Sequence, residues 1–267
     1  MTGAGAGDDD GALLLPSAGP DPLPLRLALT AVRGYARGRR PLRFRSPDSP
    51  QGRWVQVPAF GWSRFDARPV GPPGDDDVLV GEVLHGRLDR AGWAAVRDTL
   101  SEVRPLTAAA VHRAGGRAFW ELPDEELSVL GEPGTVGAAL RSIGRASGTH
   151  HLGHVLAPLH HRYPALIPHF TRSTRRALFP HVEEGDSGVE AVIRRELRAN
   201  EAAFAVLEDA VATELGDARP TRLRLHDILL WLTTTLRLAH AVELGRRSGD
   251  DAGEEWDGAR TSAARLR

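Results

Sequence analysis

Seven of the chain's eleven histidines lie between His150 and His181. Imidazole changes its charge more readily near neutral pH than any other side chain, and it is a common metal ligand. The spacings of His150 and His151 from His154 would put two imidazoles on one face of a helix, as a metal site requires. However, Pro158 separates them from the next histidines, and the segment lacks the glutamate of a metalloprotease helix. We therefore predict neither a metal site nor a cofactor.

Asp227 is the carboxylate that best suits acid–base chemistry. It stands in the apolar sequence LRLHDILLWL, so we expect its side chain to be at least partly buried and to need a partner. Arg224 and His226 are within reach, and this pattern favours a structural ion pair. If the chain is an enzyme, Asp227 and His154 are the candidate catalytic residues, and they would have to converge in one pocket with the neighbouring histidines.

A second group of polar residues is a candidate nucleic-acid site. It surrounds the extended segment that Pro164 and Pro168 impose on the chain. Its cations could bind phosphates and its tyrosine could stack on a base. The alternative is an exposed last turn of a helix, where cations complement the helix dipole. The candidate residues are His160, His161, Arg162, Tyr163, Arg172, Arg175 and Arg176.

The composition excludes several classes of protein. The formal net charge is −1, so the chain has no global basic field that would indicate nucleic acid. All 34 cationic residues are arginine, and they are spread along the chain, which favours a GC-rich coding bias over a phosphate-binding patch. Cysteine is absent, which excludes disulfides, thiol catalysis and zinc sites with cysteine ligands.

No segment is typical of a membrane or secreted protein. The first residues carry aspartates at 8–10, where a secretory signal needs positive charge. The most apolar run, Leu223–Leu238, is interrupted by Arg224, Asp227 and Arg237, which argues against a membrane span. We expect a cytoplasmic protein, and the sequence does not indicate a protein partner.

The elements that would position these residues are mostly helical. The pattern predicts a single mainly α domain over 23–246, between disordered segments at 1–22 and 247–267. A short strand at Trp54–Val57 is a possible minor β element. Leu223–Leu244 is apolar on nearly every side, which predicts a buried central helix near the C-terminus. Large aromatic side chains should enter the core; these are Trp54, Phe60, Trp62, Phe65 and Trp93.

Prolines and glycines should divide the helices. We expect Pro105 and Pro158 to interrupt helices, and Gly144 and Gly148 to frame a loop. Residues 149–178 would then form a bent pair of helices that presents imidazoles and guanidinium groups outward.

Three short motifs occur in order along the chain. They are FGWSRFD at 60–66, HHRYPALIP at 160–168 and LRLHDILLWL at 223–232. Together they resemble a family of uncharacterised bacterial proteins known only as a domain of unknown function. That family shows F-x-x-x-x-F-D, a segment ending in P-x-L-I/V-P, and a closing R-x-x-D-x-x-x-W, here Arg224, Asp227 and Trp231. The resemblance implies a domain and no particular reaction.

The order of elements between 143 and 178 is also similar to that of the helix-hairpin-helix DNA glycosylases, in which a hairpin loop binds a DNA phosphate through backbone amides. By this resemblance, 143–157 would form the hairpin and the next helix, and 166–178 would hold the catalytic aspartate. Thr171 stands where that aspartate should be, and the chain has no lysine. The resemblance therefore implies a scaffold that contacts nucleic acid without base excision.

The sequence leads to three hypotheses of function. The first is a cytoplasmic helical protein that contacts nucleic acid through 160–176 without catalysis. The second is a hydrolase-like enzyme that uses the His150–His181 cluster on a small polar or phosphorylated substrate. The third is a partner-binding protein with no ligand site.

Overall fold

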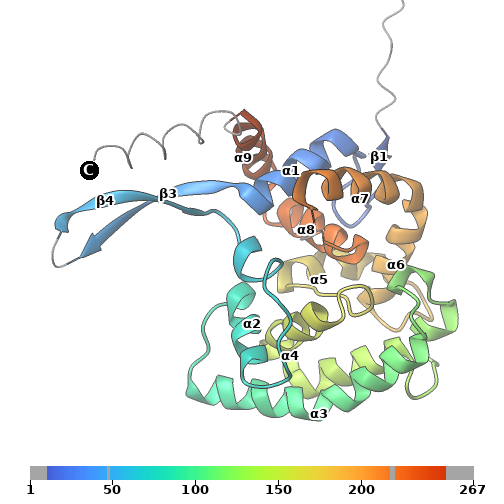
Figure 1. Ribbon diagram of the computed structural model, residues 1–267. Coiled ribbons are helices and arrows are strands. Elements are labelled where there is room, and N and C mark those ends of the chain that lie inside the picture. The colour runs from blue at the N-terminus through green and yellow to red at the C-terminus, as the bar shows by residue number, and fades with distance from the viewer. Residues whose placement is uncertain (1–10, 47–48, 217–219, 251–267) are drawn as a thin grey trace, which may run out of the picture.

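Helices dominate the structure, as the sequence predicts. The computed structural model of the chain describes residues 11–46, 49–216 and 220–250. These residues form many helices and two small two-stranded antiparallel sheets. Figure 1 shows the helices gathered in two groups, one above the other, with a long two-stranded arm that projects from one side.

The upper group in Figure 1 joins the two ends of the described chain. α1 (Leu25–Arg37) packs along α9 (Leu238–Asp250), and α6 (Val189–Ala199), α7 (Glu201–Leu215) and α8 (Arg222–Thr234) complete the group. α8 contacts all the others and is buried along most of its length. This confirms the buried C-terminal helix that the apolar sequence predicts.

The lower group positions the histidines. α2 (Asp76–His85) and α3 (Arg90–Ala114) both pack on α4 (Val136–Arg162), and α5 (Arg172–Leu178) links this group to α8. Buried apolar side chains of both groups form one continuous core. Short 3-10 helices lie in the connections: η1 (Trp62–Arg64), η2 (Phe119–Glu121), η3 (Asp124–Leu127) and η4 (Phe179–His181).

The prediction of one helix over Leu223–Leu244 is wrong. α8 ends at Thr234, and α9 starts at Leu238 after a sharp turn. Leu236 in that turn has a φ of 57° and is 93% exposed. The break lets α9 leave the centre and pack on α1, which an unbroken rod could not do.

The predicted breaks at Pro105 and Pro158 are also wrong. Both prolines lie inside continuous helices, α3 and α4. A proline removes one backbone hydrogen bond, but here the helices pack against each other along their length, and this tertiary packing outweighs the local preference. The bend in α4 is at Gly148, whose φ of 60° and ψ of −173° are readily adopted only by glycine. The loop expected between Gly144 and Gly148 is reduced to this kink.

The N-terminal segment is more ordered than the sequence predicts. Disorder was expected for residues 1–22, but Ala12–Leu13 (β1) pairs with Leu23–Pro24 (β2), and Leu13 and Leu15 are buried. The backbone N–H of Leu14 donates to Asn200 Oδ1 at 2.6 Å. Of the expected tails, residues 1–10 and 251–267 lie outside the described residues.

The arm is an antiparallel hairpin of β3 (Arg39–Ser46) and β4 (Ser49–Pro58), so the strand predicted at Trp54–Val57 belongs to a longer element. Trp54 is 69% exposed, and its predicted place in the core is wrong because the arm projects away from the helices (Figure 1). The other aromatic predictions are largely confirmed, since three of the side chains are buried and Trp93 is partly buried. The three are Phe60, Trp62 and Phe65.

The crossing of α1 and α9 depends on two glycines. A Cβ atom on Gly34 would lie 1.8 Å from the backbone oxygen of Ala241, and one on Gly245 would lie 1.9 Å from the backbone oxygen of Thr30. The two backbones can approach each other this closely only because neither residue has a side chain.

Replacing Gly34 by alanine is expected to destabilise the fold by about 1–3 kcal/mol, because the helices must move apart. Alanine is intrinsically the better helix former by about 1 kcal/mol, so the effect opposes the local propensity. Gly144→Ala is the matched control, since a Cβ there meets no atom within 4 Å. Urea unfolding monitored by circular dichroism measures both variants. Equal stability of Gly34→Ala and the unchanged chain would contradict the close crossing.

Candidate active site

Residues from four separate segments meet where the two helical groups join. Thr221 caps the N-terminus of α8 by accepting a hydrogen bond from the backbone N–H of Arg224 at 3.3 Å. The first turns of α8 then place Arg224 and Asp227, three residues apart, on one side of the helix. His169 comes from the extended segment between α4 and α5, and Tyr35 and Asp66 come from α1 and the loop after η1.

Arg224 is the centre of a buried polar network. Its Nε and Nη2 donate to the two oxygens of Asp66 at 2.6 and 3.1 Å, Nη2 also donates to Tyr35 Oη at 2.9 Å, and Nη1 donates to Asp227 Oδ2. The side chains of Arg224, Asp66 and Asp227 are only 6%, 5% and 5% exposed. Burial by itself would lower the pKa of Arg224, but Asp66, Tyr35 and Asp227 hold it well above its ordinary value. The guanidinium is therefore permanently charged.

Only one of the two carboxylate oxygens of Asp227 has hydrogen-bond partners. Its Oδ2 accepts hydrogen bonds from Arg224 and from His169 Nδ1, the latter at 2.9 Å. Burial favours the neutral acid, but the interactions with His169 and Arg224 outweigh it and lower the pKa of Asp227. Oδ1 is buried and has no hydrogen-bond partner among the described residues. A buried carboxylate oxygen without a donor is costly, so this atom marks a place where a ligand could bind.

A row of imidazoles leads away from Asp227. His169 Nε2 lies 3.0 Å from His85 Nε2, and the His85 ring lies near the His154 ring, with centroids 5.2 Å apart and the ring planes tilted by 50°. Burial, with help from His169 and His154, lowers the pKa of His85 to about 3. Neutral His85 has one ring proton, which is on Nδ1 in one tautomer and on Nε2 in the other. It can therefore donate to His169 Nε2 or accept from it.

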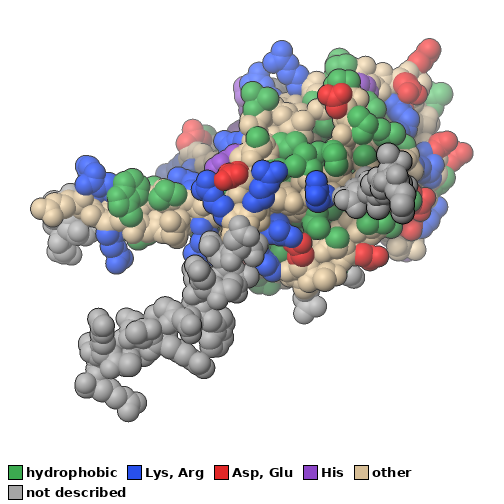
Figure 2. All heavy atoms as spheres, turned by 90° about the horizontal axis from the view of Figure 1, so that it is seen from above, with side chains coloured by type: hydrophobic (Ala, Val, Ile, Leu, Met, Phe, Trp, Pro, Cys, Tyr) green, Lys and Arg blue, Asp and Glu red, His purple; other side chains and the backbone are tan. Residues whose placement is uncertain are grey.

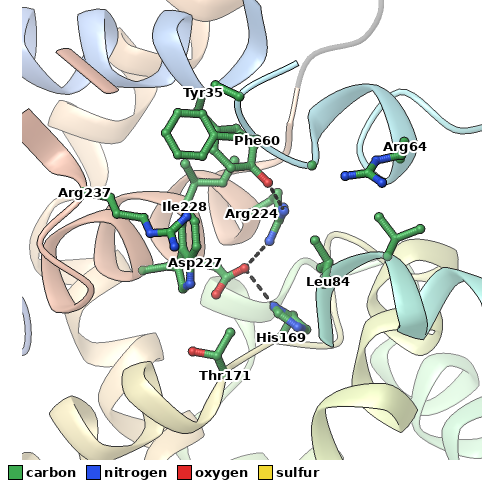
Figure 3. Close-up of a pocket in the computed structure, with 14 residues that line it drawn as sticks. Tyr35, Phe60, Arg64, Leu84, His169, Thr171, Arg224, Asp227, Ile228 and Arg237 are labelled. Atoms are coloured by element: carbon green, nitrogen blue, oxygen red, sulfur yellow. Dashed lines mark hydrogen bonds and ion pairs between the residues drawn. The ribbon is translucent and has the colours of Figure 1, made fainter. Parts of the chain in front are cut away.

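A cavity of about 180 Å³ opens beside Asp227 and His169 (Figure 3). Arg64 and Arg237 line it in addition to Arg224, and both are exposed side chains. The Arg237 guanidinium lies 5.2 Å from the centre of the Trp231 ring. The remaining wall is mostly apolar or aromatic and includes Tyr35, Phe60, Val83, Leu84, Ile228 and Trp231.

The structure confirms the predicted ion pair of Asp227 with Arg224. His226, the other expected partner, instead bonds to Glu196 Oε2 through its Nε2 at 2.7 Å. His154, the second candidate catalytic residue, does not line the cavity; its Nε2 lies 3.0 Å from the backbone oxygen of Gly86. His169 belongs to the predicted histidine cluster but was not singled out as a site residue, and His85 lies outside that cluster and was missed.

Four of the candidate nucleic-acid residues are held by the protein itself. His160 is buried, with Nδ1 2.6 Å from the Ile167 oxygen, and burial lowers its pKa to about 3. His161 and Arg162 contact the segment 68–77, where Arg162 donates to Asp77 at 3.1 Å. Tyr163 packs against the core. Arg172, Arg175 and Arg176 are exposed on α5.

The expectation that 149–178 presents its imidazoles outward is wrong for three of the six histidines in this span, whereas His150 is exposed. His154, His160 and His169 are buried. Each of these rings has a polar partner inside the protein, which offsets the cost of burying it: His154 and His160 meet backbone oxygens, and His169 meets Asp227. Within the described residues, no three histidine, aspartate or glutamate side chains are placed to hold a metal ion. None of the described helices combines the length and apolar character that a bilayer crossing requires.

The motifs singled out in the sequence meet at this site. Phe60 and Asp66 of the first motif contact Trp231 and Arg224 of the third. The second motif ends next to His169. The span for which a helical hairpin was implied, 143–157, lies within the kinked α4. Comparisons of the chain with protein families, with curated proteins and with solved structures found no match.

Proposed function

We propose that the chain is an enzyme that binds a small anionic molecule carrying a hydroxyl or amine group and moves a proton at that group. The observation that supports this most directly is the unpartnered, buried Oδ1 of Asp227 beside a cavity. A hydroxyl or amine of a ligand would supply the missing hydrogen bond. This develops the second hypothesis from the sequence, with His169 of the His150–His181 cluster as the histidine that orients Asp227.

The charge of the cavity supports an anionic ligand. Asp66 and Asp227 together balance Arg224 and offset part of the remaining charge, whereas Arg64 and Arg237 have no acidic partner among the described residues. Guanidinium groups bind phosphate and carboxylate through paired hydrogen bonds. A small phosphorylated or carboxylated substrate would therefore orient its anionic end toward these two arginines.

Asp227 is the group that takes the proton, and His169 holds it in place. Asp227 is ionised, so His169 must donate to it through Nδ1–H, which leaves Nε2 facing His85. A substrate hydroxyl that donates to the free Oδ1 can transfer its proton to that oxygen, so that the substrate O–H bond breaks and Asp227 becomes the neutral acid. His169 keeps its Nδ1 proton on Oδ2 throughout this step, and His85 stays neutral. The carboxylate also orients the imidazole, as the orienting acid does in other acid–base sites.

Contact with nucleic acid through 160–176 stays a prediction. Arg172, Arg175 and Arg176 support it because they are exposed and no described acidic side chain pairs with them. The inward position of His160 and the pairing of Arg162 with Asp77 weaken it.

Arg237→Gln is expected to weaken ligand binding about tenfold or more, because a charge-assisted hydrogen bond is worth about 1.5–3 kcal/mol. Calorimetric titration of inorganic phosphate, phosphate monoesters and small hydroxy acids into the full chain measures the affinity. Arg247→Gln is the matched control, since Arg247 pairs with Glu243 on the exposed side of α9. If both variants bind like the unchanged chain, or if none of these anions binds, the proposal fails.

Asp227→Asn separates binding from catalysis. Asparagine keeps an oxygen for Arg224 and His169 but cannot take a proton, so turnover of the bound ligand should fall by about 10²–10⁴-fold. Proton NMR of the ligand over time measures turnover, and the same calorimetry measures binding. Unchanged turnover would remove Asp227 from the reaction.

A further inference from the structure

The β3–β4 hairpin is a surface that nothing in the described chain covers. Figure 1 shows it extending from the helices, and all of its described side chains are exposed or partly exposed. An isolated two-stranded hairpin buries little and is marginally stable on its own. Its strands of 8 and 10 residues give it a length of about 25–30 Å. Such an arm suits contact with a partner.

The charged side chains of the arm are nearly all of one sign. The sequence from Arg39 to Pro58 holds five arginines and a single acidic residue, Asp48, which lies outside the described residues. The described part of the hairpin therefore has only positive side-chain charges, and a complementary partner must be negative.

The strand register places these arginines on both faces of the hairpin. Residues directly opposite each other share a face. Arg40 opposite Val57 and Phe44 opposite Arg53 put two arginines on one face. Arg39 opposite Pro58 and Arg43 opposite Trp54 put two on the other. Figure 2 shows arginines on both margins of the arm with hydrophobic side chains between them.

This two-faced distribution favours a groove over a flat surface. A protein or membrane partner would cover one face, and arginines on the other face would then contribute little. The two walls of a duplex groove carry phosphates on both sides of an inserted element. The DNA major groove is about 12 Å wide and admits a two-stranded ribbon.

The exposed apolar side chains fit the same partner. Leu42, Phe44 and Trp54 are 41%, 49% and 69% exposed, and Leu42 and Phe44 are next to arginines along β3. Within a groove, such side chains contact base edges and thymine methyl groups while the guanidinium groups bind phosphates. We propose that the β3–β4 hairpin inserts into a groove of double-stranded DNA.

Anisotropy of a fluorescent duplex of about 20 base pairs, titrated with the full chain, tests this directly. We expect micromolar or tighter binding at about 50 mM salt that weakens on the order of 100-fold by about 200 mM, as for roughly four phosphate contacts. The variant with Arg39, Arg40, Arg43 and Arg53 all changed to glutamine should bind at least about 30-fold more weakly, with a flatter salt dependence. Because these residues are outside the core, its thermal unfolding should be unchanged.

The matched control carries Arg172, Arg175 and Arg176 changed to glutamine on α5. This variant sets the hairpin against the competing prediction of contact through 160–176: if the hairpin is the site, its binding should stay within about threefold of the unchanged chain. Three outcomes would overturn the proposal: absence of binding at tens of micromolar, equal or greater loss in the α5 variant, or binding to anionic phospholipid vesicles without binding to DNA. The arm variant keeps every residue of the cavity, so loss of DNA binding with intact anion binding also separates this proposal from the proposed enzyme.

Discussion

Replacing Arg224 by methionine is expected to lower the free energy of unfolding by about 3–5 kcal/mol, because it leaves buried charges without a partner. Asp66 and Asp227 each lose a charged hydrogen bond, and Tyr35 loses the donor at its oxygen. Since whole domains are stable by about 5–15 kcal/mol, the variant would be close to unfolding. Urea titration followed by circular dichroism measures the loss.

The neighbourhood of Arg224 provides two comparisons. Arg224→Lys should also destabilise, because an ammonium group cannot reproduce the planar, three-nitrogen contact. Arg247→Met should cost no more than about 0.5 kcal/mol, because Arg247 and its partner Glu243 are 68% and 50% exposed. Equal effects of Arg224→Met and Arg247→Met would show that the buried network contributes nothing to the fold.

Acidification is expected to destabilise the protein already at pH values well above those at which carboxylates titrate. Burial lowers the pKa of His85 and His160 to about 3 in the folded chain, whereas a histidine in an unfolded chain titrates near about 6.5. Between these values the unfolded state binds more protons, so stability is complete above about pH 6.5 and falls as the pH decreases toward about 3. Each histidine contributes a slope of about 1.4 kcal/mol per pH unit, and the two together about 2.7.

His160→Asn tests the origin of this slope. The asparagine amide can donate to the Ile167 oxygen in place of Nδ1–H but cannot be protonated, so the slope should decrease by about one proton. Adding His85→Asn should decrease the slope by about one further proton. Urea titrations at several pH values between about 7.5 and about 4.5 give the slopes. If the single and double variants keep the slope of the unchanged chain, other groups cause the acid sensitivity.

The sequence predicted those features that depend on residues close together in the chain. The pair of Arg224 with Asp227 follows from a spacing of three residues in a helix, and the burial of α8 follows from its apolar sequence. The mainly helical fold follows from similar periodicity. The prolines at 105 and 158 show where this reasoning fails, because packing between α3 and α4 outweighs the preference of single residues.

The rest of the site depends on contacts that no local pattern encodes. His85 and His169 are 84 residues apart, and nothing around either residue indicates the other. The hairpin is a similar case. The sequence RRPLRFRS lacks the alternation of a half-buried strand, since neither face of β3 is buried, and its pairing with β4 is visible only in the structure.

The long separations within the site have a consequence for how function is acquired. Arg224 reaches Asp66 and Tyr35 across 158 and 189 residues of chain. Closing loops of that length costs entropy that is recovered only when the final contacts form, so such contacts tend to form late. A chain still emerging from the ribosome, or one cut before α8, would contain most of the histidines but neither Arg224 nor Asp227, so the site would be absent. The proposed activity would therefore begin only after α8 has been synthesised and packed.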